Sequence, residues 1–513
     1  MDKEPRPQVP AMTLEDLRAV GPVDGVVIGD GSVPVSGIAL DSRQVHVGDA
    51  FAALTGHHLH GVAYVAEALA NGAGAIITDR MGWQLWQGMD EFDSGIPVLV
   101  LDDARPWLGA LADAVYGRPT QSLTLLGVTG TNGKTTVASM IEAGLRTANH
   151  SVGFIGTTGI RIGDQTIESS RTTPEATTLH ALFALMKGQQ ASDVVMEVSS
   201  HAMTESRVAG FTFDVVGFTN LSQDHLDYHG TMEEYFDAKA QLFTPEHANA
   251  GVVCVDDEWG RRLVALSPIP ITTVSASGEP ADWSWKRQPS GSWAVVGPND
   301  EQYAVDLLLP GEFNRANALV AFAMLREIGI APEAIVEALA RVQVPGRLEY
   351  VPGGEPMGIR GFVDYAHTPD AIARVITAVR DFTKGRIIVV VGAGGDRDAT
   401  KRPLMGQMAA RLADLVIVTD DNPRSEDPAR IRAAVMEGAQ AVLSADSGSL
   451  IEIAGRREAV VEAVALAAPD DVVLLLGKGH EQGQEINGVL TPFDDRRELR
   501  EAFLLRTAGG DAQ

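Results

Sequence analysis

The sequence predicts an α/β protein of three domains. A central domain with a phosphate loop and a parallel sheet is flanked by an N-terminal α/β domain and a C-terminal Rossmann-like domain. At 513 residues the chain is too long for one hydrophobic core. Short apolar strands alternate with helical patterns, which is typical of βαβ units. Gly- and Pro-containing segments at 117–120 and 344–346 mark two boundaries. We therefore expect domains at 1–120, 121–345 and 346–513.

The first domain alternates short strands with helices, and the apolar runs 51–54 and 74–77 are predicted strands. The first ten residues are charged and rich in proline, unlike a secretory signal, so we expect them to form a tail. No apolar run approaches the roughly 18 residues that a membrane span requires. Nothing in this region therefore predicts export or membrane insertion.

Charge and cysteine usage limit the possible partners and location. The formal net charge is −27, which argues against nucleic-acid binding because a polyanion requires a basic face. Cys254 is the only cysteine, so the chain has no intramolecular disulfide, and its apolar surroundings predict a buried thiol. We expect a cytoplasmic monomer that acts on small molecules, without nucleic acid or membrane partners.

A glycine-rich loop in the second domain follows an apolar strand at 123–128 and opens a helix with apolar residues at helical spacing. Such a loop presents backbone N–H groups to phosphate at a helix N-terminus. Lys134 can reach the terminal phosphates, and the Thr135 hydroxyl can ligate Mg²⁺. The first glycine of the usual pattern is replaced by Val128, and a simple glycine-rich turn is the alternative. The predicted ATP or GTP contacts are Gly130, Thr131, Asn132, Gly133, Lys134, Thr135 and Thr136.

Two further segments carry metal-binding residue types. Glu197 ends an apolar strand at 194–197, where a carboxylate that holds a metal is expected in such a fold. The segment 220–230 follows the strand 215–218 and contains two histidines and two aspartates within six residues. One histidine alone would more often pack or cap a helix. The group of four favours a metal or phosphate site.

In the last domain, strands at 361–365, 387–391, 415–419 and 472–476 alternate with helical patterns, which predicts a doubly wound parallel sheet. Polar clusters at 394–398, 420–424 and 477–481 each follow the carboxyl end of a strand. Ligands bind at that edge of open α/β sheets. A turn explains any one cluster, whereas the three together indicate a shared crevice.

The sequence resembles the Mur ligases, the ATP-dependent amide-forming enzymes of peptidoglycan precursor synthesis, in its motifs and in their order. Five segments carry this resemblance: Thr129–Thr135, Met196–His201, Asp224–Asp227, Tyr235–Lys239 and Leu309–Ala318. The resemblance covers nearly the whole chain, and it accounts for the displaced glycine of the phosphate loop. It implies an N-terminal domain that binds a UDP-sugar and a C-terminal domain that binds an amino acid.

For the central site the resemblance implies a set of catalytic and metal-binding roles. Lys134 would hold the β- and γ-phosphates, Thr135 and Glu197 would ligate one Mg²⁺, and His225 would serve a second. Lys239 resembles the family lysine that reacts with CO₂ to form a carbamate. A site that lowers the lysine pKa favours this reaction, since an uncharged amine must attack CO₂. Without the resemblance, Lys239 would be taken for a surface lysine on a helix.

The remaining nucleotide contacts also come from the resemblance. Asn314 and Asn317 lie on one predicted helical face and resemble the residues that contact adenine, although helix capping explains them equally well. Arg347 and Asp364 would reach ATP from the third domain. ATP bound between domains implies that the last domain closes over it.

The muramoyl substrate is implied by two regions, in the first and second domains. The segment 40–43 followed by 56–57 resembles a uridine-nucleotide pocket, and the loop 172–174 resembles one that grips the muramoyl-dipeptide. The expected contacts are Ser42, His57, Thr172, Thr173, Ser199 and Arg207.

The identity of the added amino acid rests on residues 422–424. Their Asn-Pro-Arg form resembles the family members that add diaminopimelate rather than lysine. Arg424 can clamp the second carboxylate with help from Arg397, and Glu481 can pair with the distal ammonium. The expected contacts are Arg397, Asp421, Asn422, Arg424, Gly477 and Glu481.

The implied reaction is ATP-dependent ligation of diaminopimelate to the D-glutamyl γ-carboxylate of UDP-N-acetylmuramoyl-L-alanyl-D-glutamate through an acyl phosphate. The alternatives are the same reaction with L-lysine, a folylpolyglutamate synthetase, or a nucleotide-driven switch that forms no bond. The pocket at 41–43 has no use in a folylpolyglutamate synthetase, and a switch leaves the carboxylate-binding residues of the third domain unexplained.

Overall fold

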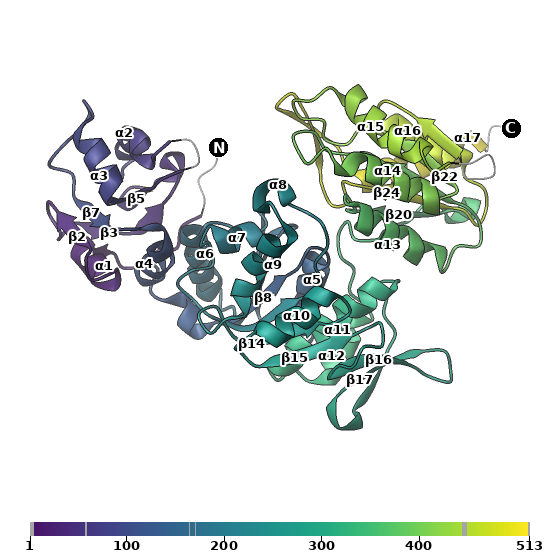
Figure 1. The fold of residues 1–513 in the computed structure, drawn as a ribbon, viewed down its shortest axis with the longest axis horizontal. Helices are drawn as coiled ribbons and strands as arrows, with labels where there is room; N and C mark the ends of the chain where they lie inside the picture. Colours follow the sequence, from purple (N-terminus) through teal and green to yellow (C-terminus); the bar gives the residue numbers. More distant parts are fainter. Residues whose placement is uncertain (1–4, 57–58, 164, 170, 444–448, 511–513) are drawn as a thin grey trace.

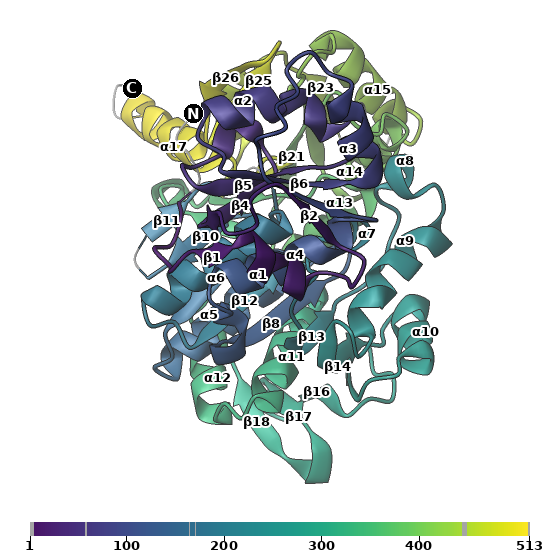
Figure 2. The same cartoon turned by 90° about the vertical axis from the view of Figure 1, so that its left-hand side faces the viewer.

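The computed structural model describes residues 5–56, 59–163, 165–169, 171–443 and 449–510. Three lobes follow one another along the chain, and each has its own principal sheet (Figure 1). The N-terminal and C-terminal lobes lie on the same side of the central lobe in both ribbon views (Figures 1 and 2). The predicted three-domain α/β architecture is confirmed, whereas the boundaries at 120 and 345 stay predictions.

The N-terminal lobe holds a five-stranded sheet. Its strands, in spatial order, are β2 (Val26–Ile28), β7 (Val98–Leu101), β6 (Ala75–Asp79), β5 (Asp49–Ala53) and β4 (Gly37–Ala39). All pairs are parallel except β2 with β7. The predicted strands at 51–54 and 74–77 correspond to β5 and β6. The helices are α1 (Leu14–Val20), α2 (Val65–Ala70), α3 (Arg80–Gln87) and α4 (Leu108–Val115), and β1 (Met12–Thr13) pairs with β3 (Pro34–Val35).

The central lobe is built on an eleven-stranded sheet. In spatial order the strands are β11 (Gln165–Ile167), β10 (Gly159–Ile162), β9 (Val152–Gly156), β12 (Asp193–Glu197), β8 (Thr124–Thr129), β13 (Phe213–Phe218), β14 (Ala248–Cys254), β15 (Ile271–Ser275), β16 (Trp283–Arg287), β17 (Trp293–Val296) and β18 (Gln302–Val305). The strands from β9 to β16 are parallel, so the segments that follow β12, β8 and β13 meet at one edge. This edge carries the phosphate loop and Glu197.

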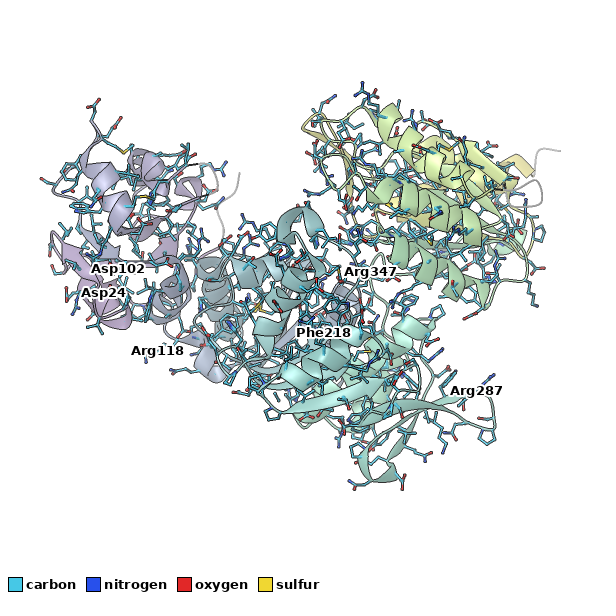
Figure 3. The ribbon with its side chains drawn as sticks, in the orientation of Figure 1. Asp24, Asp102, Arg118, Phe218, Arg287 and Arg347 are labelled. Carbon is cyan, nitrogen blue, oxygen red and sulfur yellow. The ribbon has the colours of Figure 1, made fainter. Side chains whose placement is uncertain are left out.

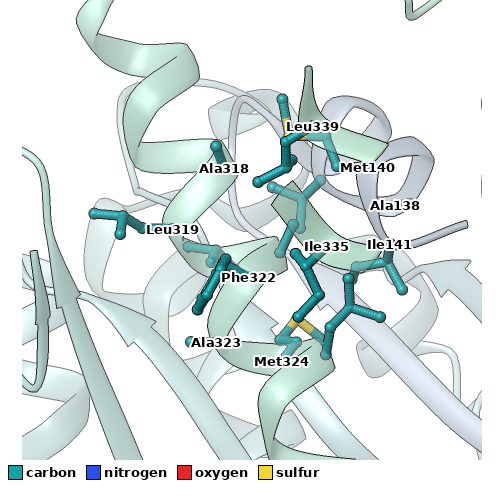
Figure 4. Packing of buried hydrophobic residues seen from close by; sticks show 14 of the residues in the cluster. Ala138, Met140, Ile141, Ala318, Leu319, Phe322, Ala323, Met324, Ile335 and Leu339 are labelled. Carbon is teal, nitrogen blue, oxygen red and sulfur yellow. The ribbon is translucent and has the colours of Figure 1, made fainter. Parts of the chain in front are cut away.

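Helices cover both faces of this sheet. They are α5 (Lys134–Thr147), α6 (Ala176–Gly188), α7 (Ser200–Thr204), α8 (Leu226–His229), α9 (Met232–Ala240), α10 (Glu258–Leu266), α11 (Glu312–Glu327) and α12 (Pro332–Leu339). Helices α5, α11 and α12 pack together in one apolar cluster, where Met140, Phe322 and Ile335 are fully buried (Figure 4). Cys254 is buried at the end of β14, as predicted. This packing fixes the direction of α5, and therefore the position of the loop at its N-terminus.

The C-terminal lobe has a six-stranded sheet. In spatial order the strands are β19 (Glu349–Val351), β20 (Arg360–Asp364), β24 (Val472–Leu476), β21 (Ile387–Val391), β22 (Leu415–Val418) and β23 (Ser449–Glu452). All pairs but β19 with β20 are parallel. The helices are α13 (Pro369–Arg380), α14 (Lys401–Leu412), α15 (Pro428–Gln440), α16 (Arg456–Leu466) and α17 (Asp495–Gly510), with a hairpin of β25 (Gly483–Ile486) and β26 (Val489–Pro492). The doubly wound sheet predicted for this region is present.

Among the described residues, no helix combines the length and the apolar character that crossing a membrane requires.

Candidate active site

The loop at 130–133 joins β8 to α5 and is held by the segment that follows β13. The backbone N–H of Thr131 donates to the carbonyl of Asn220 at 2.8 Å, and the N–H of Asn132 donates to the Asn220 side-chain oxygen at 3.1 Å. The Thr219 hydroxyl donates to the Asn132 carbonyl at 2.6 Å. These bonds hold the loop in a defined shape, so little ordering cost remains when an anion binds there.

Lys134 is the first residue of α5, and its side chain folds back over the loop. Its Nζ donates to the carbonyls of Gly130 and Thr131, at 3.0 and 2.9 Å. Burial lowers the pKa of Lys134, while Glu197 and Asp224 oppose that shift. The amine therefore lies where phosphate oxygens would approach a helix N-terminus.

One of the two predicted adenine contacts, Asn317, lies against the same loop. Gly133 has a φ of 90°, and a Cβ at this position would lie 2.3 Å from the side-chain oxygen of Asn317. Only glycine accommodates both the backbone conformation and this close approach. The Asn314 side chain donates to the Pro310 carbonyl at 2.8 Å and lies 3.3 Å from that of Asn317. The structure thus places Asn317 against the loop and Asn314 beside Asn317, bonded to the segment that precedes α11.

Glu197, at the end of β12, is fully buried and collects hydrogen bonds from two threonines. Its Oε2 accepts from the hydroxyls of Thr135 and Thr157, each at 3.0 Å, and its Oε1 accepts from the Thr157 N–H at 2.8 Å. A buried carboxylate beside a hydroxyl at a phosphate loop supplies the hard oxygen ligands that suit Mg²⁺. No group of three or more His, Cys, Asp or Glu residues in the described ranges is arranged to hold a metal. Any Mg²⁺ bound here therefore also requires hydroxyl, substrate or water oxygens.

Lys239 lies on α9 with its side chain directed toward the phosphate loop. The residue is 1% exposed, and its Nζ donates to the Gly130 carbonyl at 2.9 Å. Burial, reinforced by Lys134, holds the pKa of Lys239 well below its ordinary value, with Asp224 acting in the opposite direction. The lysine is therefore no surface residue, and its environment favours the neutral amine.

Three histidines gather beside Lys239. The ring of His201 lies 5.0 Å from that of His225 and 5.5 Å from that of His229, and His229 lies 5.1 Å from the Tyr235 ring. Burial lowers the pKa values of His225 and His229 to about 4. These imidazoles are uncharged at neutral pH, which is the form that ligates a metal.

Three residues predicted to contact the dipeptide meet at Glu197. The Thr173 hydroxyl donates to the Glu197 carbonyl at 2.9 Å and accepts from the Ser199 N–H at 3.1 Å. Arg207 donates to the Thr173 carbonyl at 3.2 Å. Arg207 also pairs with Glu175 at 3.1 Å and with Glu205 at 2.5 Å, so its charge is balanced by carboxylates of the chain.

The other contacts predicted for this substrate are less closely grouped. The Thr172 hydroxyl lies 3.2 Å from that of Thr157, next to Glu197. Ser42 is in the N-terminal lobe, where its hydroxyl donates to Glu67 at 2.5 Å. His57 lies outside the described residues.

The C-terminal lobe reaches the phosphate loop through Arg347, which lies between the two lobes (Figure 3). Its guanidinium donates to the Thr135 hydroxyl at 3.1 Å. Asp364 instead accepts hydrogen bonds from the backbone N–H groups of Leu348 and Ala366, at 2.6 and 2.8 Å, and burial raises its pKa. Arg347 therefore faces the loop at 130–133, whereas the Asp364 carboxylate holds the backbone at Leu348, next to Arg347, and at Ala366.

The loops that follow β21, β22 and β24 converge, as the positions of the polar clusters predict. Lys478 Nζ donates to the Asn422 side-chain oxygen at 2.9 Å and to Glu481 at 3.1 Å, and it lies 3.4 Å from Asp421. Arg424 donates to the carbonyl of Gly395 at 2.6 Å. This arrangement places carboxylate, amide and guanidinium groups together at the edge of the sheet where the sequence predicts a shared crevice.

Arg424 and Arg397 have different environments. The Arg424 side chain is 23% exposed and pairs with Glu485 at 3.3 Å, so its guanidinium is accessible but already has a carboxylate partner. Arg397 is exposed on the loop after β21. A bound carboxylate would compete with Glu485 for Arg424.

Two residues of the 477–481 cluster were missed as individual site residues. Lys478 is completely buried among the predicted amino-acid contacts. His480 Nε2 donates to the Thr157 carbonyl at 3.1 Å, across the boundary between lobes. The sequence feature that could have indicated both residues is a lysine between two glycines directly after a strand, followed by a histidine.

Comparison with protein-family models gives three matches along the chain. They are the Mur ligase family, catalytic domain at residues 34–116, the Mur ligase middle domain at 128–325, and the Mur ligase, glutamate ligase domain at 346–479.

Individual relatives match over most of their length. The chain is 48% identical over 485 residues to the UDP-N-acetylmuramoyl-L-alanyl-D-glutamate–2,6-diaminopimelate ligase of Streptomyces coelicolor, covering 93% of this chain and 94% of that protein. It is 47% identical over 501 residues to the protein of the same name from Corynebacterium glutamicum, covering 94% and 96%.

Solved structures match the fold as well. A structure of a UDP-N-acetylmuramoyl-L-alanyl-D-glutamate–2,6-diaminopimelate ligase matches with a TM-score of 0.66 and 30% identity, covering 97% of this chain and 99% of that one. MurF ligase from Thermotoga maritima in complex with ADP has a TM-score of 0.61 at 20% identity, with 93% and 98% covered, and shows likeness of fold alone.

Proposed function

We propose that this chain, which belongs to the Mur ligase family, uses ATP to join diaminopimelate to UDP-N-acetylmuramoyl-L-alanyl-D-glutamate. The carrying observation is the hydrogen bond from Arg347 of the C-terminal lobe to Thr135 at the phosphate loop, 3.1 Å long. This contact brings the lobe with the amino-acid crevice against the lobe that holds the nucleotide loop. Relatives of the proposed activity match over more than nine tenths of the chain.

The nucleotide is ATP, held with its phosphates at the loop 130–133. Lys134 would leave the two loop carbonyls and donate to the β- and γ-phosphates. Thr135 and Glu197 fit one Mg²⁺, and His225 with a carbamate on Lys239 fits a second. When bound, these ions neutralise phosphate charge. Asn314 and Asn317 would contact the base.

The reaction has two steps, and its atoms balance without a further reactant. The D-glutamyl γ-carboxylate attacks the γ-phosphorus of ATP, and the bond to ADP breaks to give an acyl phosphate. The neutral amino group of diaminopimelate then attacks the acyl carbon, phosphate leaves, and the amine proton passes to phosphate or solvent. The chain contributes mainly positioning and charge stabilisation, and Arg347 supplies a guanidinium at Thr135 beside the phosphate loop.

The amino-acid crevice accounts for the choice of diaminopimelate over lysine. Diaminopimelate carries a distal carboxylate that lysine lacks, and Arg424 presents an accessible guanidinium for it. Glu481 would pair with the distal ammonium beside that carboxylate. Lysine would leave Arg424 without a substrate partner, which penalises the binding of lysine.

We also propose that the protein acts as a cytoplasmic monomer.

The assignment is tested by phosphate release from ATP with the muramoyl-dipeptide and either diaminopimelate or lysine, each product being weighed by mass spectrometry. We expect release that requires both the dipeptide and diaminopimelate, and a product heavier by one diaminopimelate residue. ATP hydrolysis at the same rate without either substrate would contradict the proposal. Equal use of lysine would overturn the assigned amino acid while leaving the ligase reaction in place.

The proposed carbamate is tested with Lys239→Ala. We expect ligase activity to fall at least about 1000-fold, since both the anion and its metal contacts are lost, and added bicarbonate should not restore it. Lys187→Ala, at the end of α6, is the matched control and should retain activity. A Lys239→Ala protein with full activity would remove the carbamate from the mechanism.

A further inference from the structure

We propose that Lys478 is a positioning residue that sets the orientation of Asn422 and Glu481 and thereby makes the crevice selective for diaminopimelate. This inference rests on the proposed function and extends it to a residue that contacts other side chains rather than the substrate. It is carried by a fully buried ammonium whose side-chain partners are all residues of the proposed amino-acid site.

The hydrogen bonds of Lys478 define which way its two main partners point. Its Nζ donates to Asn422 Oδ1 at 2.9 Å and to Glu481 Oε2 at 3.1 Å. Asn422 Nδ2 donates to the same Glu481 oxygen at 2.8 Å. Lysine carries only donors, so the amide oxygen of Asn422 must face it and the amide nitrogen must face Glu481. Glu481 Oε1 has no part in these bonds and is available to a ligand.

The same ammonium links two loops that are 57 residues apart in sequence. It lies 3.4 Å from Asp421 on the loop after β22, while Lys478 itself follows β24. A Cβ on Gly477 would approach the Asp421 carboxylate to 2.7 Å, so the two loops pass each other closely. The Glu485 N–H also donates to Asn422 Oδ1, at 3.1 Å. The crevice is therefore assembled around Lys478.

The charges of this group match the distal end of diaminopimelate. Asp421 and Glu481 carry two negative charges and Lys478 one positive charge, which leaves one negative charge for the distal ammonium. Arg424, on the same loop as Asp421, would take the distal carboxylate. Lys478 is fully buried and contacts both carboxylates, whereas Arg456, which also acts on them, is paired with Asp495. Removing the charge of Lys478 therefore takes away the cation that directly balances Asp421 and Glu481. Such a crevice would lose its preference for a ligand with no net charge at its distal end.

The test measures KM values for diaminopimelate, lysine and ATP in the native protein and in the Lys478→Met variant. Methionine has a side chain of similar length to lysine but carries no charge. We expect the KM for diaminopimelate to rise at least tenfold and the KM for ATP to stay within twofold. The ratio of kcat/KM for diaminopimelate over lysine should fall at least tenfold. A loss confined to stability, with both KM values and the ratio unchanged, would overturn the inference.

Two further variants separate positioning from a general effect on folding. Arg386→Gln removes a cation that pairs with Asp471 at 2.8 Å, at the opposite edge of the same sheet, and should leave the KM for diaminopimelate within twofold. In the double variant Lys478→Met/Glu481→Gln, the KM rise should be smaller than the product of the single rises, because both changes act on one contact. A KM rise in the double variant equal to the product of the two single rises would show that Lys478 does not act through Glu481.

The outcomes keep this inference apart from the proposed function. If the native protein ligates diaminopimelate and Lys478→Met does so with unchanged KM, only the role of Lys478 fails. If the native protein does not use diaminopimelate, the proposed function fails first. If Lys478→Met shows no cooperative unfolding transition, Lys478→Gln takes its place. The same rise in the KM for diaminopimelate is expected, since the shorter side chain with its two N–H donors cannot make the three contacts of the ammonium.

Discussion

The N-terminal and C-terminal lobes are joined to the central lobe in different ways. At the first joint α4 packs on α6, and Ala181 of α6 belongs to the apolar core of the N-terminal lobe. His180 is fully buried and lies 3.3 Å from Asp113. The backbones approach so closely that a Cβ on Gly109 would lie 1.8 Å from the Ala209 carbonyl. This joint is closely packed and allows little sliding.

The second joint contains the hydrogen bonds from Arg347 to the Thr135 hydroxyl and from His480 to the Thr157 carbonyl, each 3.1 Å long. Thr135 and Thr157 both also bond Glu197, so this joint is built directly on the proposed ATP and Mg²⁺ site. A bound nucleotide would replace or strengthen the polar contacts of the second joint. The packing around Gly109 in the first joint would not change, because no proposed ligand contacts it. The difference indicates that the first joint determines stability and the second couples the lobes to the substrates.

Gly109→Val tests the first joint and should have the largest effect. The added side chain meets backbone atoms that cannot move aside, so we expect the free energy of unfolding to fall by about 3 kcal/mol or more. Urea denaturation measures this. Gly188→Ala is the control at the end of α6, where a Cβ meets nothing within 4 Å, and it should be neutral or slightly stabilising. Equal stability of Gly109→Val and the native protein would show that this joint is not tightly packed.

Arg347→Ala tests the second joint and should act on activity instead. We expect kcat/KM for ATP to fall about 100-fold, which corresponds to about 2.7 kcal/mol, while the unfolding transition changes little. Steady-state kinetics and urea denaturation of the same preparation give both values. A variant that is as active as the native protein would remove Arg347 from the nucleotide site.

His480 makes the second joint sensitive to acid. Burial, with Arg347 and Arg496 nearby, lowers the pKa of His480 to about 4, and the Tyr365 ring lies 5.3 Å away. The folded state thus disfavours a protonated imidazole that the unfolded chain accepts below about pH 6.5. Stability is therefore complete above that pH and is lost as the pH falls toward 4, by about 1–2 kcal/mol for this partly exposed ring.

The measurement is the free energy of unfolding between pH 4 and 7.5 for the native protein and for His480→Gln. Glutamine keeps a donor for the Thr157 carbonyl but does not titrate, so the variant should show a shallower decline with acid. His225 and His229, whose pKa values are also lowered to about 4, still contribute to the slope in both proteins. Identical slopes would mean that His480 is not held neutral by the joint.

Much of this arrangement was predictable from local patterns. The helix after the phosphate loop follows from apolar spacing, and the strands at 387–391 and 472–476 coincide with β21 and β24. The convergence of the three polar clusters follows from parallel topology alone. Strands β16 and β17 lie in a stretch rich in Ser, Trp and Gly. Each has only four or five residues, so the polar composition of the stretch concealed them.

The features that local patterns do not predict depend on contacts between distant segments. Lys239 is buried against the phosphate loop, where it bonds the carbonyl of Gly130, 109 residues away in sequence. The helical pattern around Lys239 gives no information about this contact. The same holds for Lys478 among the loops after β22 and β24. The accessibility of Arg424 depends on Glu485, whose position is set by the β25–β26 hairpin. Interactions of this kind require the folded chain.

Distances between labels on the three lobes test the contrast between the joints most directly. Met81, Leu266 and Leu504 are exposed on α3, α10 and α17, and Cys254 is buried with a raised thiol pKa, so cysteines introduced at the three sites would label selectively. With an ATP analogue and the muramoyl-dipeptide, we predict an unchanged distance between 81 and 266 and a shifted, narrower distribution between 266 and 504. A shift between 81 and 266, with none between 266 and 504, would contradict the account.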